Sequence, residues 1–301
     1  MKLAAVIAHA RKISRPYRVT KGDRFRLKDH DPGDTGSLRV QDKAAAEATR
    51  AEGVQGLAAL QEMLYAEDRW AALFLLQAMD AAGKDSVIKH VMSGVNPQGC
   101  QVASFKAPSA EELDHDYLWR CQRELPERGR IGIFNRSYYE EVLVVRVHPE
   151  YLAAERLPLG TVTDDLWEER FRQIRRFERH LQENGTRVTK FFLHLSRDEQ
   201  KRRFLERIDR PEKNWKFNTG DLKERSRWKE YMQAYEEMIR NTATDDAPWY
   251  VVPADHKWFT QMVVAAAMVD TLAGLDLAYP EVPATQRQAL LAAKNALLRE
   301  K

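Results

Sequence analysis

An uninterrupted apolar run, Ala71–Leu76, is followed within a few residues by the loop Asp80-Ala81-Ala82-Gly83-Lys84. Such a run favours a strand that is buried on both faces of a parallel sheet. Apolar residues at helical spacing come after the loop: Val87, Ile88, Val91 and Met92. Strand, small-residue loop, Gly-Lys and helix form the layout of a P-loop, in which backbone N–H groups and a helix N-terminus hold phosphate oxygens. The sequence therefore predicts a phosphate site at this loop.

The loop departs from the usual P-loop pattern at two positions. Ala78 replaces the usual glycine five residues before Gly83, and Asp85 replaces the usual serine or threonine directly after Lys84. A bound metal ion then needs another ligand, and the carboxylate of Asp80 is the candidate. The candidate phosphate-binding residues are Ala81, Ala82, Gly83, Lys84, Asp85 and Ser86. The alternative is a helix start that Asp80 caps, with Gly83 and Lys84 incidental.

A second apolar strand is predicted at Ile131–Phe134, and Asn135 and Arg136 follow it. A polar group at the carboxyl end of a neighbouring parallel strand lies beside the P-loop in this architecture and commonly holds the metal. Asn135 is neutral and therefore a weak ligand for a hard cation, so Glu140 and Glu141 are candidates to supply negative charge. Arg136 is a candidate for bidentate binding of phosphate. The alternative for the two glutamates is a solvated helix face.

A second charged segment, Arg197–Glu230, holds twelve Lys or Arg and eight Asp or Glu, a net charge of +4. Arg203 and Arg207 are four residues apart, so they share one helix face. The loop after this helix adds two further candidates, Lys213 and Lys216. Helix, basic loop and helix after a strand is how a lid is built that covers phosphates and brings arginines to the transferred group. We predict a lid over residues 197–240; the alternative is a solvated pair of charged helices.

The N-terminal arm, residues 1–37, is basic. Residues 1–30 carry nine Lys or Arg against two acidic residues, which points to an anionic partner. We predict a helix at the very start, from Met1 to Ala10, and then an extended segment over 17–36. Lys28 and Asp29 in that segment are candidate ligand-binding residues, and the alternative is a solvated arm.

Composition narrows the class of protein. The chain has 301 residues, of which 44% are apolar and 31% charged, with a net charge of +3. These values exclude a disordered chain and a globally basic nucleic-acid binder. Two cysteines give no disulfide framework or metal quartet. No apolar run approaches the roughly 20 residues that span a bilayer, so we expect a cytoplasmic protein without a membrane or nucleic-acid partner.

The remaining pattern predicts one domain. Its core covers residues 70–195 and 247–275, after a long amphipathic helix over 38–66 (Gln41 to Ala66). Further predicted strands are 101–105, 187–195 and 247–253, and further predicted helices are 109–124, 162–184, 255–272 and 286–298. The last of these lies in a C-terminal extension, residues 283–301.

In this order along the chain, the motifs resemble the second polyphosphate kinase family, P-loop enzymes that move phosphoryl groups between inorganic polyphosphate and nucleotides. The resemblance rests on Leu27–Pro32, Met79–Asp85, Phe134–Glu141, Arg203-Phe204, Trp215–Phe217 and Pro253–Lys257. It implies a three-layer α/β P-loop kinase-like sandwich with a parallel five-stranded sheet and a helical lid. It also implies a homo-oligomer, a dimer or a tetramer. Much of the family has aspartate at Asn135; asparagine there, with Ala78, resembles the class III subgroup that accepts both AMP and ADP.

The resemblance also implies a reaction and a role for each candidate. The terminal phosphoryl group of polyphosphate would pass reversibly to ADP, and in the subgroup to AMP, with Mg²⁺ or Mn²⁺. Lys84 and the loop amides would hold phosphate oxygens, while Asp80, Glu140, Glu141 and Asn135 would hold or orient the metal. Arg136, Arg203 and Arg207 would neutralise the transferred group, and Lys89, Lys213 and Lys216 would line the polyphosphate path. Two alternatives stay open: an ATP-dependent nucleoside monophosphate kinase, and a nucleotide- or polyanion-binding regulator without turnover.

Overall fold

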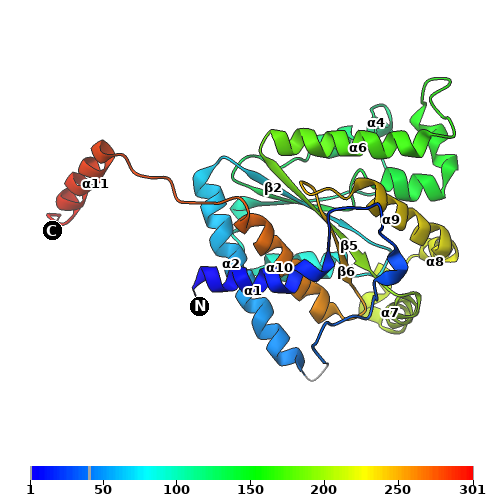
Figure 1. The fold of residues 1–301 in the computed structure, drawn as a ribbon, viewed down its shortest axis with the longest axis horizontal. Coiled ribbons are helices and arrows are strands. Elements are labelled where there is room, and N and C mark those ends of the chain that lie inside the picture. The colour runs from blue at the N-terminus through cyan, green and yellow to red at the C-terminus, as the bar shows by residue number, and fades with distance from the viewer. Residues whose placement is uncertain (1, 40–41, 301) are drawn as a thin grey trace.

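The structure, a computed structural model, describes residues 2–39 and 42–300. At its centre lies a six-stranded sheet in the order β1-β6-β5-β2-β4-β3 (Figure 1). The strands are β1 (Arg18–Val19), β2 (Ala71–Gln77), β3 (Cys100–Ser104), β4 (Ile131–Asn135), β5 (Thr186–His194) and β6 (Trp249–Pro253). The apolar run before the P-loop is therefore a central strand, with β5 on one side and β4 on the other.

The sheet has one strand more than expected. Strands β6, β5, β2, β4 and β3 pair in parallel, as predicted. Strand β1 pairs with β6 in the antiparallel direction, with Arg18 opposite Tyr250 and Val19 opposite Trp249. The prediction of a five-stranded sheet was thus wrong by this edge strand. Two residues are too short to carry an alternating pattern, so only the position of the arm against β6 creates β1.

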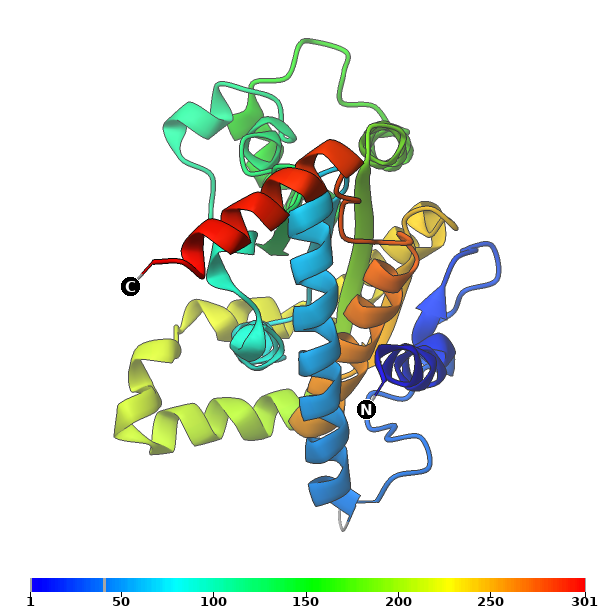
Figure 2. The ribbon, with the colours of Figure 1, turned by 90° about the vertical axis from the view of Figure 1, so that its left-hand side faces the viewer.

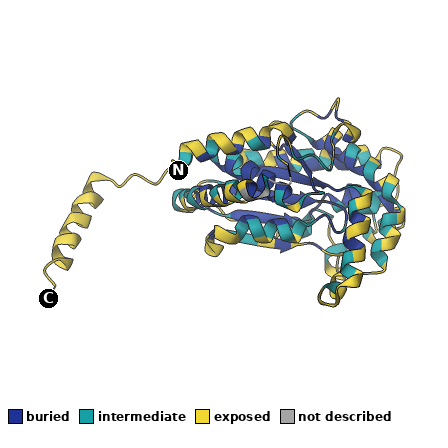
Figure 3. Ribbon diagram, turned by 90° about the horizontal axis from the view of Figure 1, so that it is seen from below, coloured by how far each residue is buried: buried dark blue, intermediate teal, exposed yellow. Residues whose placement is uncertain are grey.

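Side chains along the strands alternate between two hydrophobic cores. On β2, Phe74 and Leu76 belong to one core, while Leu73 and Leu75 belong to the other. Each large side chain that is fully buried in this way stabilises the fold by about 1.5–3 kcal/mol. Helices α1 (Leu3–Ser14), α2 (Lys43–Glu67), α3 (Lys84–Val91) and α10 (Lys257–Ala273) cover the first core, and α6 (Leu166–Glu183) and α9 (Trp228–Thr242) cover the second. Buried strands thus lie between helical layers with exposed outer faces (Figure 3).

Three predicted helices differ from the structure. The N-terminal helix, predicted to end at Ala10, continues to Ser14. The helix predicted over 109–124 is two short helices, α4 (Ala110–Leu113) and α5 (Trp119–Gln122). Between them the side chain of Asp116 accepts a hydrogen bond from the backbone N–H of Leu118 at 2.9 Å, which competes with helical pairing. The helix predicted from residue 162 begins at Leu166. The predicted start of the long helix at Gln41 lies outside the described residues, as do Met1 and Lys301.

The charged segment after β5 forms α7 (Arg197–Asp209), a 3-10 helix η8 (Pro211–Lys216) and α8 (Gly220–Ser226). These elements extend from the body of the protein (Figure 2). Helix α9 follows directly but belongs to the body, because Tyr231, Tyr235 and Met238 are buried in the second core. We call residues 197–226 the α7–α8 segment.

The C-terminal helix α11 (Ala284–Leu297) stands apart from the rest of the chain (Figures 1 and 3). All its residues are exposed. The short 3-10 and π helices elsewhere are η1 (Arg15–Tyr17), η2 (Leu27–Asp29), η4 (Met92–Gly94), η5 (Pro97–Gly99), η6 (Glu141–Val145) and η7 (Pro149–Glu155). Within residues 2–39 and 42–300, no helix is both long enough and apolar enough to cross a bilayer.

Candidate active site

The loop between β2 and α3 has the strained backbone of a binding loop. Gly83 has φ +104° and precedes the first residue of α3, Lys84. Ala81 has φ +65°, a left-handed conformation that L residues other than asparagine and aspartate rarely adopt. The Lys84 ammonium group donates a hydrogen bond to the carbonyl oxygen of Ala78 at 2.9 Å, so the lysine side chain folds back over the loop. Backbone strain of this kind persists where the surroundings enforce it, and it clusters at functional sites.

Lys84 is surrounded by charge. The pKa of its ammonium group is lowered to about 8, first by burial and then by the positive charge of Arg136. The carboxylates of Asp80, Glu140 and Asp85 act in the opposite direction. The structure therefore brings together, around one lysine, charged groups from the P-loop and from the segment after β4.

Arg136 links the two segments. Its guanidinium group lies 2.9 Å from Asp80 Oδ1 and 2.8 Å from Glu140 Oε2. Its backbone N–H donates to the carbonyl oxygen of Leu76 at 3.1 Å, and its φ is +66°. The two carboxylates, Glu140 first, raise the pKa of Arg136 above its ordinary value, so the group is always charged. About a third of the side chain (34%) stays exposed, which leaves the guanidinium group accessible to an anion.

Asn135 and Gln77 complete this edge of the sheet. The Asn135 amide donates to Asp85 Oδ1 at 2.8 Å, while its buried Oδ1 atom has no hydrogen-bond partner. In the orientation that satisfies both of its amide atoms, Gln77 donates to Glu140 Oε1 at 2.8 Å and accepts from the backbone N–H of Ser137 at 3.1 Å. A buried acceptor without a partner is costly, so the Asn135 oxygen is suited to a ligand.

The oxygen donors here suit a hard cation that also binds substrate. Among the residues that the structure describes, no group of three His, Cys, Asp or Glu side chains converges to hold a metal alone. Asp80, Glu140 and the unpartnered Asn135 Oδ1 are oxygen donors at one edge of the sheet. Mg²⁺ is usually bound by one or two carboxylates together with substrate phosphates and water. The residues present therefore fit Mg²⁺ held jointly with a phosphate chain.

Glu141 is not part of this group. Its side chain is 4% exposed and pairs with Arg170 at 2.9 Å. The pKa of Glu141 is raised to about 8, first by burial and then by the negative charge of Glu155. The two consecutive glutamates therefore point to different surroundings: Glu140 to Arg136, and Glu141 to the second core.

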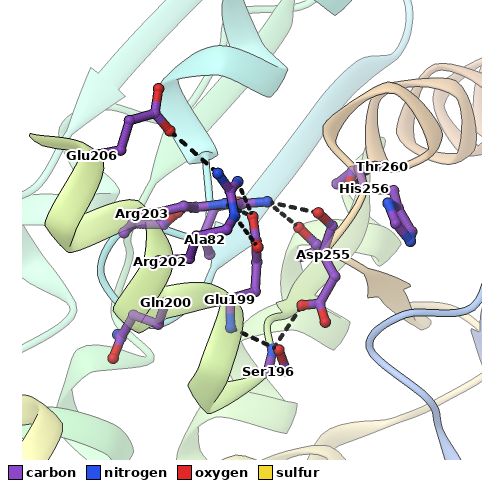
Figure 4. Close-up of polar contacts among 12 residues, drawn as sticks. Ala82, Ser196, Glu199, Gln200, Arg202, Arg203, Glu206, Asp255, His256 and Thr260 are labelled. Atoms are coloured by element: carbon purple, nitrogen blue, oxygen red, sulfur yellow. Dashed lines mark hydrogen bonds and ion pairs between the residues drawn. The ribbon is translucent and has the colours of Figure 1, made fainter.

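Arg203 on α7 binds the P-loop backbone from the protein interior. It donates to the carbonyl oxygens of Ala81 and Ala82, both at 2.9 Å, and to those of Ala254 at 2.6 Å and Asp255 at 3.1 Å. Its Nε atom donates to Glu199 Oε1 at 2.7 Å. Figure 4 shows the guanidinium group between Ala82 and Asp255. An arginine has five N–H donors, and the protein itself uses all five here.

The other basic candidates on the α7–α8 segment lie nearer its surface. Arg207 donates to the carbonyl oxygen of Lys216 at 3.1 Å and lies 3.7 Å from Asp221. Lys213 pairs with Glu206. The Lys216 ammonium group lies 4.9 Å from the ring centroid of Trp215, which is 79% exposed. These lysines are held by neighbours on their own segment.

The structure brings the arm residues and Lys89 to the surface. Lys28 and Lys89 are exposed, and Asp29 pairs with Arg26 at 2.8 Å. Ser86 accepts a hydrogen bond from Gln261 at 3.2 Å and so joins α3 to α10. None of these contacts reaches the Arg136 cluster, the group formed by Asp80, Lys84, Arg136 and Glu140.

Sequence reasoning missed three residues of the site. Gln200 donates to the carbonyl oxygen of Asp80 at 2.9 Å. Asp221 on α8 has a pKa raised by burial and by the charge of Asp80 in the P-loop. Burial and the nearby Glu140 raise the pKa of Tyr235 on α9. Gln200 lies one helical turn before Arg203, the spacing that could have identified it.

Comparison with known proteins identifies the family. A profile of the family described as Polyphosphate kinase 2 (PPK2) matches residues 40–279. An ADP-polyphosphate phosphotransferase of Rhodopseudomonas palustris is 56% identical over 247 residues, which is 82% of this chain and 86% of that protein. An AMP/ADP-polyphosphate phosphotransferase of Meiothermus ruber is 48% identical over 265 residues, 88% of this chain and 95% of that protein.

The fold agrees with these matches. The crystal structure of polyphosphate kinase 2 from Arthrobacter aurescens TC1 superposes with a TM-score of 0.83 at 40% sequence identity, over 93% of this chain and 96% of that chain. The shared fold is mixed α/β with a mostly parallel sheet, which fits a P-loop kinase. The resemblance that the motifs suggested is therefore confirmed: the chain belongs to the polyphosphate kinase 2 family.

Proposed function

We propose that this chain transfers the terminal phosphoryl group of inorganic polyphosphate to ADP and to AMP, in a reversible reaction. One observation carries the proposal: Arg136 lies between Asp80 of the P-loop and Glu140, at 2.9 and 2.8 Å, beside Lys84. This cluster joins the phosphate-binding loop to a partly exposed cation. The names of the Rhodopseudomonas and Meiothermus relatives support polyphosphate as donor and ADP and AMP as acceptors.

Phosphoryl transfer needs positioning and charge neutralisation more than covalent chemistry. Lys84 and the backbone N–H groups of residues 81–86 would hold phosphate oxygens. Arg136 and Arg207 would neutralise the charge that the transferred group carries in the transition state. Asp221 would orient Arg207, from which it is separated by 3.7 Å.

The same edge of the sheet would bind a metal ion. Asp80 and Glu140 would supply carboxylate oxygens, and Asn135 would supply its amide oxygen. Mg²⁺ or Mn²⁺ would there screen the charge on phosphate oxygens. Asn135 in place of aspartate removes one negative charge from the site, so the phosphate chain itself would complete the oxygen ligands.

Arg203 has a different role in this proposal from the one its position in the sequence suggests. Because its five donors are bonded to the protein, it would hold the P-loop rather than the phosphate. Glu141 would likewise hold Arg170 rather than metal. The basic residues that would guide the rest of the polyphosphate chain are Lys28, Lys89, Lys213 and Lys216, with Asp29 orienting the arm.

We further propose that the chain forms a homo-oligomer, a dimer or a tetramer, in the cytoplasm. Helix α11 and its C-cap residue carry four leucines that are 54–73% exposed: Leu290, Leu291, Leu297 and Leu298. They recur seven residues apart, so they form an apolar face that another copy would bury. Sedimentation of Leu290→Glu/Leu297→Glu beside the unchanged chain tests this: an unchanged oligomer would exclude α11 as the interface.

The function is tested by ATP formation from ADP, and then from AMP, with Mg²⁺ and polyphosphate as sole donor. We expect product from both acceptors, and a loss of at least about 1,000-fold in kcat for Lys84→Ala. The matched control is Lys229→Ala, which removes an exposed lysine. Turnover of AMP with ATP but not with polyphosphate would establish the monophosphate kinase instead. Saturable nucleotide binding without any product would establish a binding protein.

A further inference from the structure

A buried ion pair lies among the side chains of the second core, on the face of the sheet that α6 and α9 cover. We propose that this pair, Lys190 on β5 and Glu178 on α6, together with Tyr138 and Tyr139, positions Glu140 and Arg136 for phosphoryl transfer. These four residues would be positioning residues, since none of them belongs to the Arg136 cluster. The inference rests on the proposed function.

The contacts form a closed network. Lys190 Nζ lies 2.6 Å from Glu178 Oε2. The hydroxyl groups of Tyr138 and Tyr139 both donate to the other carboxylate oxygen of Glu178, at 2.9 and 2.7 Å. Lys190 also donates to the Tyr139 hydroxyl at 3.2 Å and to the carbonyl oxygen of Thr242 at 2.8 Å. All four side chains of the network are at most 2% exposed.

Every hydrogen-bonding group in this network has a partner. The three N–H donors of Lys190 go to Glu178, Thr242 and Tyr139. The Tyr139 hydroxyl donates its proton to Glu178 and accepts from Lys190, so both its functions are used. Fully satisfied buried networks specify one arrangement of their members, because any other arrangement leaves a polar group unpaired in a medium of low dielectric.

The network ends next to Arg136 and Glu140 in the chain. Tyr139 directly precedes Glu140 in the chain, and Tyr138 lies two residues after Arg136. From the other side, Gln77 binds Glu140 Oε1 at 2.8 Å and Ser137 at 3.1 Å. The backbone of Arg136 is in the left-handed region, with φ +66°, a conformation that persists only where the surrounding structure enforces it. The tyrosine hydroxyl groups supply part of that surrounding structure.

Stability alone does not explain these residues. A buried ion pair contributes little or even costs stability relative to apolar side chains of the same volume. The second core is otherwise built from apolar and aromatic side chains that would fill the same space, such as Trp249, whose ring lies 5.3 Å from Lys190 Nζ. What apolar side chains would not supply is a fixed direction for both tyrosines. We infer that the pair is present for that direction.

The test removes the two hydroxyl groups and keeps the ion pair and the ring packing. In Tyr138→Phe/Tyr139→Phe we expect kcat to fall about 10- to 100-fold, because a shift of about 1 Å in a catalytic group has that effect. The KM for ADP should stay within about threefold, since Lys84 and the loop amides are unchanged. Assays run well below the midpoint of thermal unfolding of each variant, as measured by circular dichroism.

The matched control is Tyr250→Phe, which removes the hydroxyl group of a tyrosine that is 2% exposed in the first core. It should lower the midpoint of unfolding and leave kcat unchanged. A second variant, Lys190→Met/Glu178→Gln, removes both charges and keeps an acceptor for the tyrosines. We expect it to retain more kcat than the double phenylalanine variant.

The outcomes separate the two proposals. If the wild-type chain turns over polyphosphate and Tyr138→Phe/Tyr139→Phe has the same kcat, this inference is overturned and the proposed function stands. So would an equal loss of kcat in the Tyr250→Phe control, because the effect would then be one of general stability. Absence of polyphosphate-dependent turnover in the wild-type chain would overturn the proposed function, and the positioning role with it.

Discussion

Two arginines touch the P-loop and use their guanidinium groups in opposite ways. Arg136 binds the side chains of Asp80 and Glu140 and keeps 34% of its own side chain exposed. Arg203 binds backbone carbonyl oxygens and Glu199, and only 4% of its side chain is exposed. The first arginine pairs with carboxylates that a metal ion or a phosphate would reorganise. The second has no donor left for a ligand.

The difference teaches that closeness to a phosphate loop does not decide the role of an arginine. What decides it is whether its donors face solvent or the backbone. The carbonyl oxygens of Ala81 and Ala82 need donors because a buried backbone acceptor without a partner is costly. Arg203 satisfies them and thereby stabilises the left-handed backbone of Ala81. One arginine therefore serves the reaction directly, and the other serves the shape of the loop.

Among the arginine variants, the largest effect should come from Arg136→Ala. We expect kcat to fall about 1,000-fold, since the variant loses the charge that stabilises the transferred phosphoryl group. The free energy of unfolding should change by less than about 1 kcal/mol, because partly exposed ion pairs contribute little to stability. ATP formation and urea unfolding measure the two quantities. Arg172→Ala on α6, with a 45% exposed side chain that pairs with Glu169, is the control.

The next largest effect should come from Arg203→Ala, which should lower stability more than the rate of phosphoryl transfer. Removing this guanidinium group takes the arginine donor from four carbonyl oxygens and leaves Glu199 with Arg202 alone, so we expect the free energy of unfolding to fall by about 3 kcal/mol. Arg203→Lys should recover only part of it, because an ammonium group has three donors in place of five. Urea unfolding of both variants checks this. Full stability with kcat lost as severely as in Arg136→Ala would place Arg203 among the phosphate ligands.

Much of this site could be predicted from local sequence. The apolar run of β2, the Gly-Lys step at Gly83 and the polar residues after β4 each leave a pattern of a few consecutive residues. Parallel strands bring their carboxyl ends to one edge, so Asp80 and Arg136 were expected to meet although they lie 56 residues apart. Family motifs supplied the order of these segments.

Other features depend on tertiary contacts that leave no local pattern. Arg203 and Arg207 share a helix face by spacing, yet only Arg203 reaches the carbonyl oxygens of the P-loop. Glu140 and Glu141 are consecutive, so their side chains do not face the same way, but only the fold decides that Glu140 meets Arg136 and Glu141 meets Arg170. Strand β1 likewise forms only because the arm meets β6. Residue type and spacing predicted which residues lie near the site, but not which of their atoms are accessible to a ligand.

A pH profile tests the electrostatic side of the comparison. The pKa of Lys84 is about 8, whereas the ordinary value is 10.5, because burial disfavours its charge. As the pH rises through 8 the lysine loses its proton, so kcat/KM for polyphosphate should fall about tenfold between pH 7 and pH 9. Stability should move the other way: between pH 8 and 10.5 the unfolded chain binds more protons than the folded one, so this residue's contribution to the free energy of unfolding rises. A kcat/KM that stays flat to pH 9.5 would contradict the lowered pKa.

The smallest effect should come from Arg207→Ala. This variant decides whether Arg207 serves the reaction, like Arg136, or the shape of the loop, like Arg203. Its side chain is 23% exposed and pairs loosely, at 3.7 Å, with Asp221. Because part of the guanidinium group is accessible, as in Arg136, we expect a loss of about fivefold in kcat/KM for polyphosphate with less than about 1 kcal/mol in stability. The control is Arg202→Ala on the same helix, where the side chain is 61% exposed and pairs with Glu199; it should change neither quantity. If Arg207→Ala instead lowered the free energy of unfolding by several kcal/mol at unchanged kcat/KM, Arg207 would be a brace like Arg203, and Arg136 would act without an arginine from the α7–α8 segment.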